Sequence, residues 1–156
     1  MKITKAQWVY FLSCNLPVSF IICITCSLLA DIHIDWINFL YNLLLSYTIS
    51  NLVSIFVPLV QIGKRFTKKF NVPNDTYKGN IRYRLLAGLI ITLIFFVFVN
   101  PTLTVFNHFY YHVTPPMLTF LTWFRNAPIV ILVGYVISLI SDFFSYRLAR
   151  LIDPNF

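Results

Sequence analysis

Four polar residues stand out within otherwise apolar stretches of this sequence: Asn100, Arg125, Asn126 and Asp142. Side chains of these types bind ions or polar solutes inside membranes, because no bulk water competes for them there. Asn100 and Asn126, like Asn15 further upstream, come one or two residues before a proline. An Asn beside a proline kink either hydrogen-bonds to a neighbouring helix or acts as a ligand at a broken helix, and the sequence leaves both roles open.

Arg125 and Asp142 each have two interpretations. If its helix begins at Trp123, Arg125 extends to the outer headgroups; if it begins at Met117, Arg125 lies about 12 Å into the helix and needs a partner. The candidate partners are Asn100, Asn126, Asp31 and Asp35. Asp142 neutralises Arg147 or faces water at the membrane edge, or else binds a transported cation or proton.

A redox site is a further alternative, because Cys23 and Cys26 form a CxxC motif and resemble the pair of a membrane thiol oxidoreductase. We expect both cysteines near the C-terminus of a helix, where the helix dipole disfavours the reactive thiolate. The remaining cysteine, Cys14, forms no second pair on the outer side. Thiol chemistry is therefore the least favoured of the functions considered.

Metal binding and enzyme catalysis find little support. His108 and His112 would share a helical face and, with a third histidine and a carboxylate, complete a zinc site, but the prolines at 115 and 116 interrupt their segment. The sequence contains no Glu, no Gly-rich phosphate loop and no Ser-His-Asp arrangement. We therefore expect no metal, no cofactor and no enzymatic activity.

Small and polar residues also recur every four positions in three of the apolar stretches. Such rows allow helices to approach closely in lipid, with hydroxyl groups hydrogen-bonding across the contact, or else line a narrow polar path. The residues that we expect at helix contacts are Ser19, Cys23, Ser27, Ser46, Ser50, Ser54, Gly134 and Ser138; Asn42 and Asp142 extend two of these rows.

The elements that position these residues are four membrane-spanning helices. The 156-residue chain is 58% hydrophobic and only 11% charged, whereas a soluble domain is about 25% charged. Asp, Glu, Lys and Arg are absent from residues 6–30, 36–63, 85–124 and 126–141, and about 20 apolar residues suffice to cross a bilayer. We predict an all-α membrane protein with spans at 8–29, 37–62, 85–106 and 120–144, and with Pro17, Pro58, Pro101 and Pro128 inside them.

The distribution of basic residues predicts the orientation. Eleven of the twelve Lys and Arg residues fall on the side of the two chain ends, and only Arg125 falls on the other. The positive-inside rule then places both termini in the cytoplasm of a cell whose cytoplasmic membrane holds the chain. The first span is read as an uncleaved signal anchor, because it is longer than a signal-peptide core.

The chain divides into a first hairpin, 1–70, a basic cytoplasmic linker, 71–84, and a second hairpin, 85–156. The net charge of +7 favours anionic lipid headgroups over nucleic acid as partner, because the bases border apolar segments. The headgroup contacts are assigned to Lys64, Arg65, Lys68 and Lys69. The turn-forming residues between 63 and 84 predict a linker without a fold of its own.

Both halves are apolar hairpins whose second helix ends in basic residues, which favours two repeats related by an axis along the membrane normal. With Val57-Pro58-Leu59 followed by Lys64-Arg65 and Lys68-Lys69, the chain resembles a family of small bacterial membrane proteins of unknown function. In that family a two-helix unit occurs singly or in tandem. Here the basic residues stand further from Pro58 than in the family pattern, and the second half has no equivalent proline.

The favoured function is that of a non-enzymatic accessory or interaction subunit that assembles with itself or with a membrane partner. The alternative is a small oligomeric transporter or channel for an ion or small solute, working through Asn100, Arg125, Asn126 and Asp142.

Overall fold

The computed structural model describes residues 4–29, 35–72, 81–111 and 116–154, and these residues form five α-helices and no β-strand. Side chains of residues 116–120 and 122 are not described. The helices are α1 (Lys5–Leu29), α2 (Trp36–Phe56), α3 (Leu59–Lys68), α4 (Ile81–Tyr110) and α5 (Pro116–Ile152).

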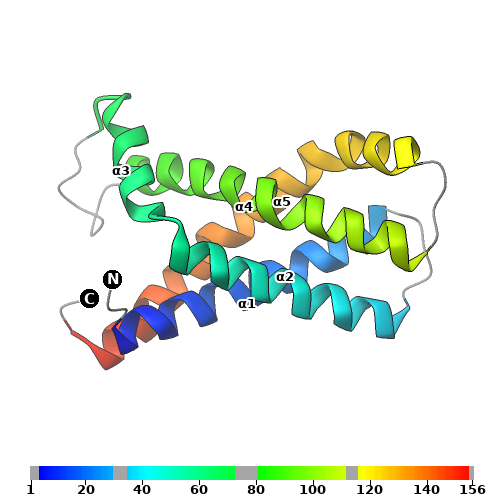
Figure 1. The fold of residues 1–156 in the computed structure, drawn as a ribbon. Helices are drawn as coiled ribbons and strands as arrows, with labels where there is room; N and C mark the ends of the chain where they lie inside the picture. Colours follow the sequence, from blue (N-terminus) through cyan, green and yellow to red (C-terminus); the bar gives the residue numbers. More distant parts are fainter. Residues whose placement is uncertain (1–3, 30–34, 73–80, 112–115, 155–156) are drawn as a thin grey trace.

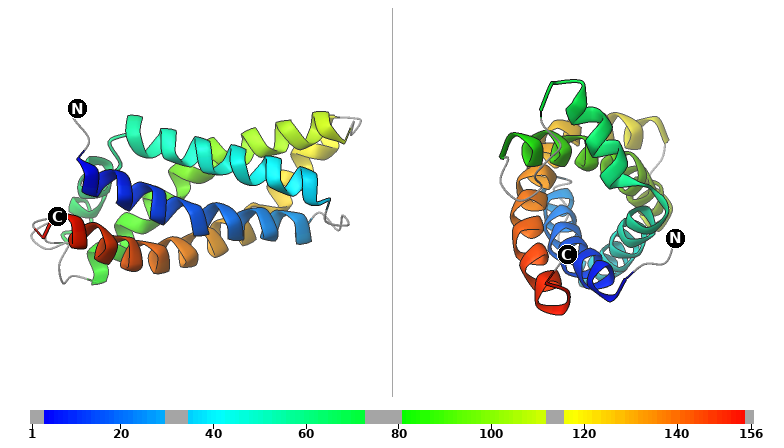
Figure 2. Two further views of the ribbon diagram at one scale, coloured as in Figure 1. Left: turned by 90° about the horizontal axis from the view of Figure 1, so that it is seen from below. Right: turned by 90° about the vertical axis from the view of Figure 1, so that its left-hand side faces the viewer.

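Four of these helices are long and apolar enough to cross a membrane: α1, α2, α4 and the Trp123–Ile152 part of α5. They form an elongated bundle in which successive long helices run in opposite directions (Figure 1). The start of α1 and the end of α5 lie at one end of the bundle, together with α3 and the start of α4 (Figures 1 and 2). The prediction of an all-α membrane protein with four membrane helices is confirmed.

Each long helix packs against two others, so that the four form a ring in the order α1, α2, α4, α5 (Figure 2). This arrangement places the two hairpins in the same orientation, as two repeats along the membrane normal require. The two corresponding contacts are unequal, however, because α1 packs against α5 far more extensively than α4 packs against α2. Small side chains are among the most buried on these two helices: Ala6 on α1 and Ser145 and Ala149 on α5 are almost fully buried.

The distribution of polar residues is reversed relative to that of a soluble protein. Within the described residues, twelve buried side chains are polar and ten are hydrophobic. Large apolar side chains instead cover the outside, where Leu44 on α2 is 62% exposed and Leu132 on α5 is 63% exposed. Such an exterior is stable against lipid and not against water, because apolar surface exposed to water costs about 25 cal/mol per Å².

The second span ends earlier than the sequence predicts. The predicted helix over residues 37–62 includes Pro58, but α2 ends at Phe56 and Val57 is extended, with φ −92° and ψ 126°. Proline lacks an N–H to donate and its ring disfavours helical geometry in the residue before it, so the helix stops there. The expectation that all four prolines lie inside spans is therefore wrong for Pro58 and holds for the other three.

The chain then turns into α3, which lies across the end of the bundle beside α4 (Figures 1 and 2). The described residues at both ends of the segment 63–84 are consequently helical. Residues 63–68 belong to α3, and α4 begins at Ile81 rather than at residue 85. The turn residues between 73 and 80 lie outside the described part of the chain.

Candidate functional site

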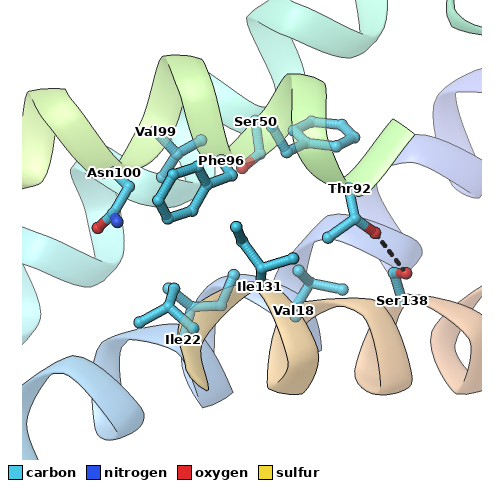
Figure 3. A pocket seen from close by; sticks show the side chains of 12 residues that line it. Val18, Ile22, Ser50, Thr92, Phe96, Val99, Asn100, Ile131 and Ser138 are labelled. Atoms are coloured by element: carbon cyan, nitrogen blue, oxygen red, sulfur yellow. Dashed lines mark hydrogen bonds between the residues drawn. The ribbon is translucent and has the colours of Figure 1, made fainter. Parts of the chain in front are cut away.

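The interior of the bundle holds a small cavity of about 30 Å³ to which all four long helices contribute. Most of its lining is apolar, with Val18 and Ile22 of α1 on one side (Figure 3). Four polar side chains also reach it: Ser50 from α2, Thr92 and Asn100 from α4, and Ser138 from α5. A water molecule fits a space of this size.

The cavity lies midway through the membrane-spanning part of α5. Gly134 lines it, eight residues before Asp142 and nine residues after Arg125. At the rise of an α-helix these separations correspond to about 12 Å and 14 Å, which together approach the thickness of a hydrocarbon core. The cavity therefore lies in the middle part of the Trp123–Ile152 segment, which is long and apolar enough to cross a membrane.

Two of the four polar side chains satisfy each other, whereas two do not. The hydroxyl groups of Thr92 and Ser138 are 3.2 Å apart and joined by a hydrogen bond (Figure 3). Asn100 is 7% exposed and Ser50 is 4% exposed, yet neither side chain hydrogen-bonds to any residue that the structure describes. Of the predicted polar site, Asn100 alone therefore lines the cavity.

A charged cluster lies toward the end of the bundle that holds the start of α1 and the end of α5. The Arg84 guanidinium of α4 donates to the Asp142 carboxylate of α5 over 2.7 Å, and the Tyr10 hydroxyl of α1 donates to the other carboxylate oxygen. The expectation that Asp142 neutralises Arg147 is wrong, because Arg147 stacks over the Phe143 ring, 4.2 Å from its centroid. Asp142 is thus held by two helices rather than left open to a cation.

The opposite edge carries a neutral cluster of amides between α2 and α4. Asn107 accepts hydrogen bonds from Asn38 and Asn42, both at 3.0 Å, and donates one to Asn42 at 2.9 Å. The Tyr111 hydroxyl, 2.7 Å from the Asn38 amide, extends the cluster. These bonds join the two hairpins near their outer connections.

Asn15 has the structural role that the sequence left open. Its amide donates to Asn51 and to Ser54 on α2, both at 3.0 Å. Asn126 is half-buried and makes no hydrogen bond within the described part of the chain. The three residues of the Asn-before-proline pattern therefore have three different environments.

Arg125 is exposed and forms no ion pair with the residues that the structure describes. Its helix begins at Pro116, earlier than the snorkelling interpretation required. At the helical rise, Arg125 lies about 14 Å from Gly134 and about as far from the start of α5. Its exposed side chain agrees with extension toward lipid headgroups rather than with burial against a partner.

The rows of small residues are buried inside the bundle. The buried members are Ser19, Cys23, Ser46, Ser50 and Ser54. Gly134 is also buried, and Ser27 and Ser138 are half-buried. Most residues of the rows therefore lie at contacts within the bundle, and the self-assembly that the sequence predicts stays a prediction.

The thiols and histidines do not assemble a reactive centre in the described residues. All three cysteines are free, and Cys23 is 2% exposed, which closes it to a protein substrate. No group of three His, Cys, Asp or Glu side chains gathers within the described ranges. His33, His112 and Asp31 lie outside those ranges.

The predicted headgroup residues lie on α3 and just after it. Lys64, Arg65, Lys68 and Lys69 are all exposed. The opposite face of α3 packs on α4 through Gly63, where a Cβ atom would lie 3.3 Å from that of Ala87, and through Thr67, which is fully buried. The helix therefore presents its cations outward beside an exposed Phe70.

Several residues of these clusters were missed by the sequence reasoning. Asn38 was detectable, because it begins the row that continues with Asn42 and Ser46 at intervals of four. Arg84, Tyr10 and Asn107 carried no such signal, since their roles depend on which helices become neighbours. No protein-family model, curated protein or solved structure matches this chain.

Proposed function

We propose that the chain is a non-enzymatic accessory or interaction subunit of the cytoplasmic membrane, with its basic end bound to anionic lipid. The basic end is defined as α3 with Lys69, the start of α1, the first turn of α4 and the last turns of α5. The observation that carries the proposal is α3: an amphipathic helix that lies across the bundle, with four exposed cations on it and just after it.

The physical argument rests on the two kinds of side chain that α3 and the residues after it expose. Phe70 and Val60 are 56% and 59% exposed, and so are available to the acyl boundary of a bilayer. Lys64, Arg65, Lys68 and Lys69 are exposed beside them, within reach of headgroups. A helix of this composition lies in the interface plane, and each Lys or Arg near an anionic surface contributes about 1 kcal/mol.

The same distribution supports a cytoplasmic location for the basic end. The start of α1, α3 with Lys69, the start of α4 and the end of α5 contain every Lys and Arg of the described residues except Arg125. Basic segments beside membrane helices stay on the cytoplasmic side, so both termini are assigned to the cytoplasm. A partner would therefore meet this end, since the small-residue rows are already used within the bundle.

Lipid binding is tested by native mass spectrometry of protein released from nanodiscs of phosphatidylglycerol and phosphatidylcholine. The unaltered protein is expected to retain phosphatidylglycerol selectively. A variant with Lys64, Arg65, Lys68 and Lys69 all changed to Gln should lose this selectivity several-fold. Arg125→Gln is the matched control at the other edge and should retain it; equal selectivity in all three proteins would contradict the proposal.

The interaction role is tested by affinity purification from native membranes. A specific membrane partner should copurify with the unaltered protein and be lost with the four-fold Gln variant. Recovery of lipids and chaperones alone would count against an accessory role.

Transport is the second candidate, and Asn100 is the observation that favours it. A buried amide facing a cavity at mid-membrane is typical of solute sites in transporters. In proteoliposomes, solute or ion flux above that of empty vesicles should then fall in Asn100→Leu and persist in Asn126→Leu, whose side chain is outside the cavity. Flux equal to that of empty vesicles for the unaltered protein would exclude transport.

A further inference from the structure

The cavity between the four long helices contains hydrogen-bonding capacity that the protein itself does not use. Asn100 offers two N–H donors and one acceptor, and Ser50 offers one hydroxyl. Both side chains line the cavity and both are more than nine-tenths buried. Within the described residues, neither has a hydrogen-bond partner.

Other residues of the same types satisfy themselves on their own helices. Asn51 and Asn107 donate to the carbonyl oxygens four residues earlier, each over 2.9 Å. Ser54 likewise donates to the carbonyl oxygen of Ser50 over 2.9 Å. Asn100 and Ser50 forgo this bond, and the close-up shows the Asn100 amide directed away from α4 toward the space above α1 and α5 (Figure 3).

An amide left without a partner in a bilayer interior is costly. Burial of an unpaired amide or hydroxyl in an apolar medium costs roughly 2–7 kcal/mol, and lipid supplies no compensating hydrogen bond. Buried polar groups with no protein partner therefore indicate a bound molecule that completes them. The Ser19 hydroxyl group, buried on α1 and without a hydrogen-bond partner among the described residues, shows the same deficit nearby.

The size and charge of the cavity limit the occupant. A space of about 30 Å³ accommodates water. No Asp, Glu, Lys, Arg or His side chain of the described residues lines the cavity. A dehydrated ion would have no counter-charge there, and the cost of burying an isolated charge is many kcal/mol.

We propose that this cavity binds neutral, hydrogen-bonding molecules of the size of water, which pair with the side chains of Asn100 and Ser50 that line it. The site is independent of the lipid-binding role of the basic end. If the protein transports a solute, the site restricts that solute to small neutral molecules rather than ions.

The test uses the unaltered protein, labelled with ¹⁵N on asparagine, in deuterated micelles, with water as the probe. A cross-peak is expected between water and the Asn100 side-chain amide protons, with the NOE-to-ROE ratio of an immobilised molecule. The Asn15 amide, bonded to Asn51 and Ser54, is the internal control and should show none. The cross-peak is assigned to Asn100 because it should be absent from the Asn100→Leu variant.

A second measurement tests whether the site binds cations. Titration with sodium, potassium or ammonium chloride should leave the Asn100 amide resonance unmoved. A saturable shift with any of these cations would overturn the assignment to neutral molecules. Absence of the water cross-peak from Asn100, with surface asparagines showing theirs, would overturn the site itself, whatever the lipid and flux experiments give.

Discussion

Single residues hold the three regions of this bundle together, and each does so by a different interaction. Arg84 and Asp142 form an ion pair toward one end of the bundle, and because their side chains are 27% and 16% exposed the pair is only partly shielded from solvent. Toward the other end, Asn107 joins the hairpins through neutral amides. Between these two clusters, the middle of the bundle contains small buried side chains and the cavity.

Asp142→Asn should lower the free energy of unfolding by about 1–3 kcal/mol, because it leaves the Arg84 charge partly buried without its counter-ion. The double variant Arg84→Gln, Asp142→Asn should recover part of the loss, since no unpaired charge remains. Thermal unfolding in nanodiscs measures both. Arg125→Gln, which removes an arginine without an ion pair to any described residue, should change stability by less than about 0.5 kcal/mol. A loss in Arg125→Gln equal to that in Asp142→Asn would contradict this account of the pair.

Asn15→Leu should lower stability by about 1 kcal/mol, the usual range for hydrogen bonds between membrane helices, because it removes two bonds to α2. Asn126→Leu is the control, since Asn126 makes no hydrogen bond within the described residues. The two variants are compared by unfolding in the same micelles. Greater sensitivity of Asn126 would show that the Asn15 bonds do not stabilise the bundle.

At the scale of elements, the sequence predicts where the helices lie better than it predicts which helices pack against one another. Apolar length and charge placement are local properties, so four spans, three internal prolines and the burial of the small-residue rows could be predicted. The partner of Asp142 could not, because Arg84 lies 58 positions away and its contact depends on how two helices pack. The local sequence offers Arg147 instead, which turns toward Phe143.

The end of α2 at Phe56 was not predicted from the sequence. Membrane helices tolerate proline, so Pro58 alone did not predict a break. The stronger indication lay after it, where Ile62 and Phe66 alternate with Lys64, Arg65 and Lys68 in a helical pattern suited to an interface rather than to a bilayer core. Because the turn residues of the segment 63–84 favoured a linker, α3 was not predicted.

Gly63→Leu should displace α3 from α4, because even a Cβ atom at this position lies 3.3 Å from the Cβ of Ala87. The readout is maleimide labelling of Thr67→Cys, a fully buried position, in a protein whose own cysteines are replaced by serine or alanine. Labelling should be slow when Gly63 is retained and at least several-fold faster when Gly63→Leu is added. Lys64→Leu, on the exposed face, should leave the rate unchanged; equal rates in all three proteins would show that Gly63 does not hold α3 in place.

At the scale of the whole molecule, the exterior is apolar along the bundle and basic at one end. This asymmetry supports the proposed orientation of the chain in the membrane, because moving the basic end across would carry α3 and both terminal segments through the hydrocarbon. The apolar exterior excludes an aqueous existence for the bundle. The lipid-binding and partner proposals both depend on this orientation.

The most direct measurement of this premise is cysteine labelling in intact cells with a membrane-impermeant maleimide. In a protein without its native cysteines, His108→Cys near the outer connection should be labelled in intact cells. Lys69→Cys at the basic end should be labelled only after permeabilisation. Labelling of Lys69→Cys in intact cells, with His108→Cys protected, would contradict the orientation and the cytoplasmic lipid-binding role that depends on it.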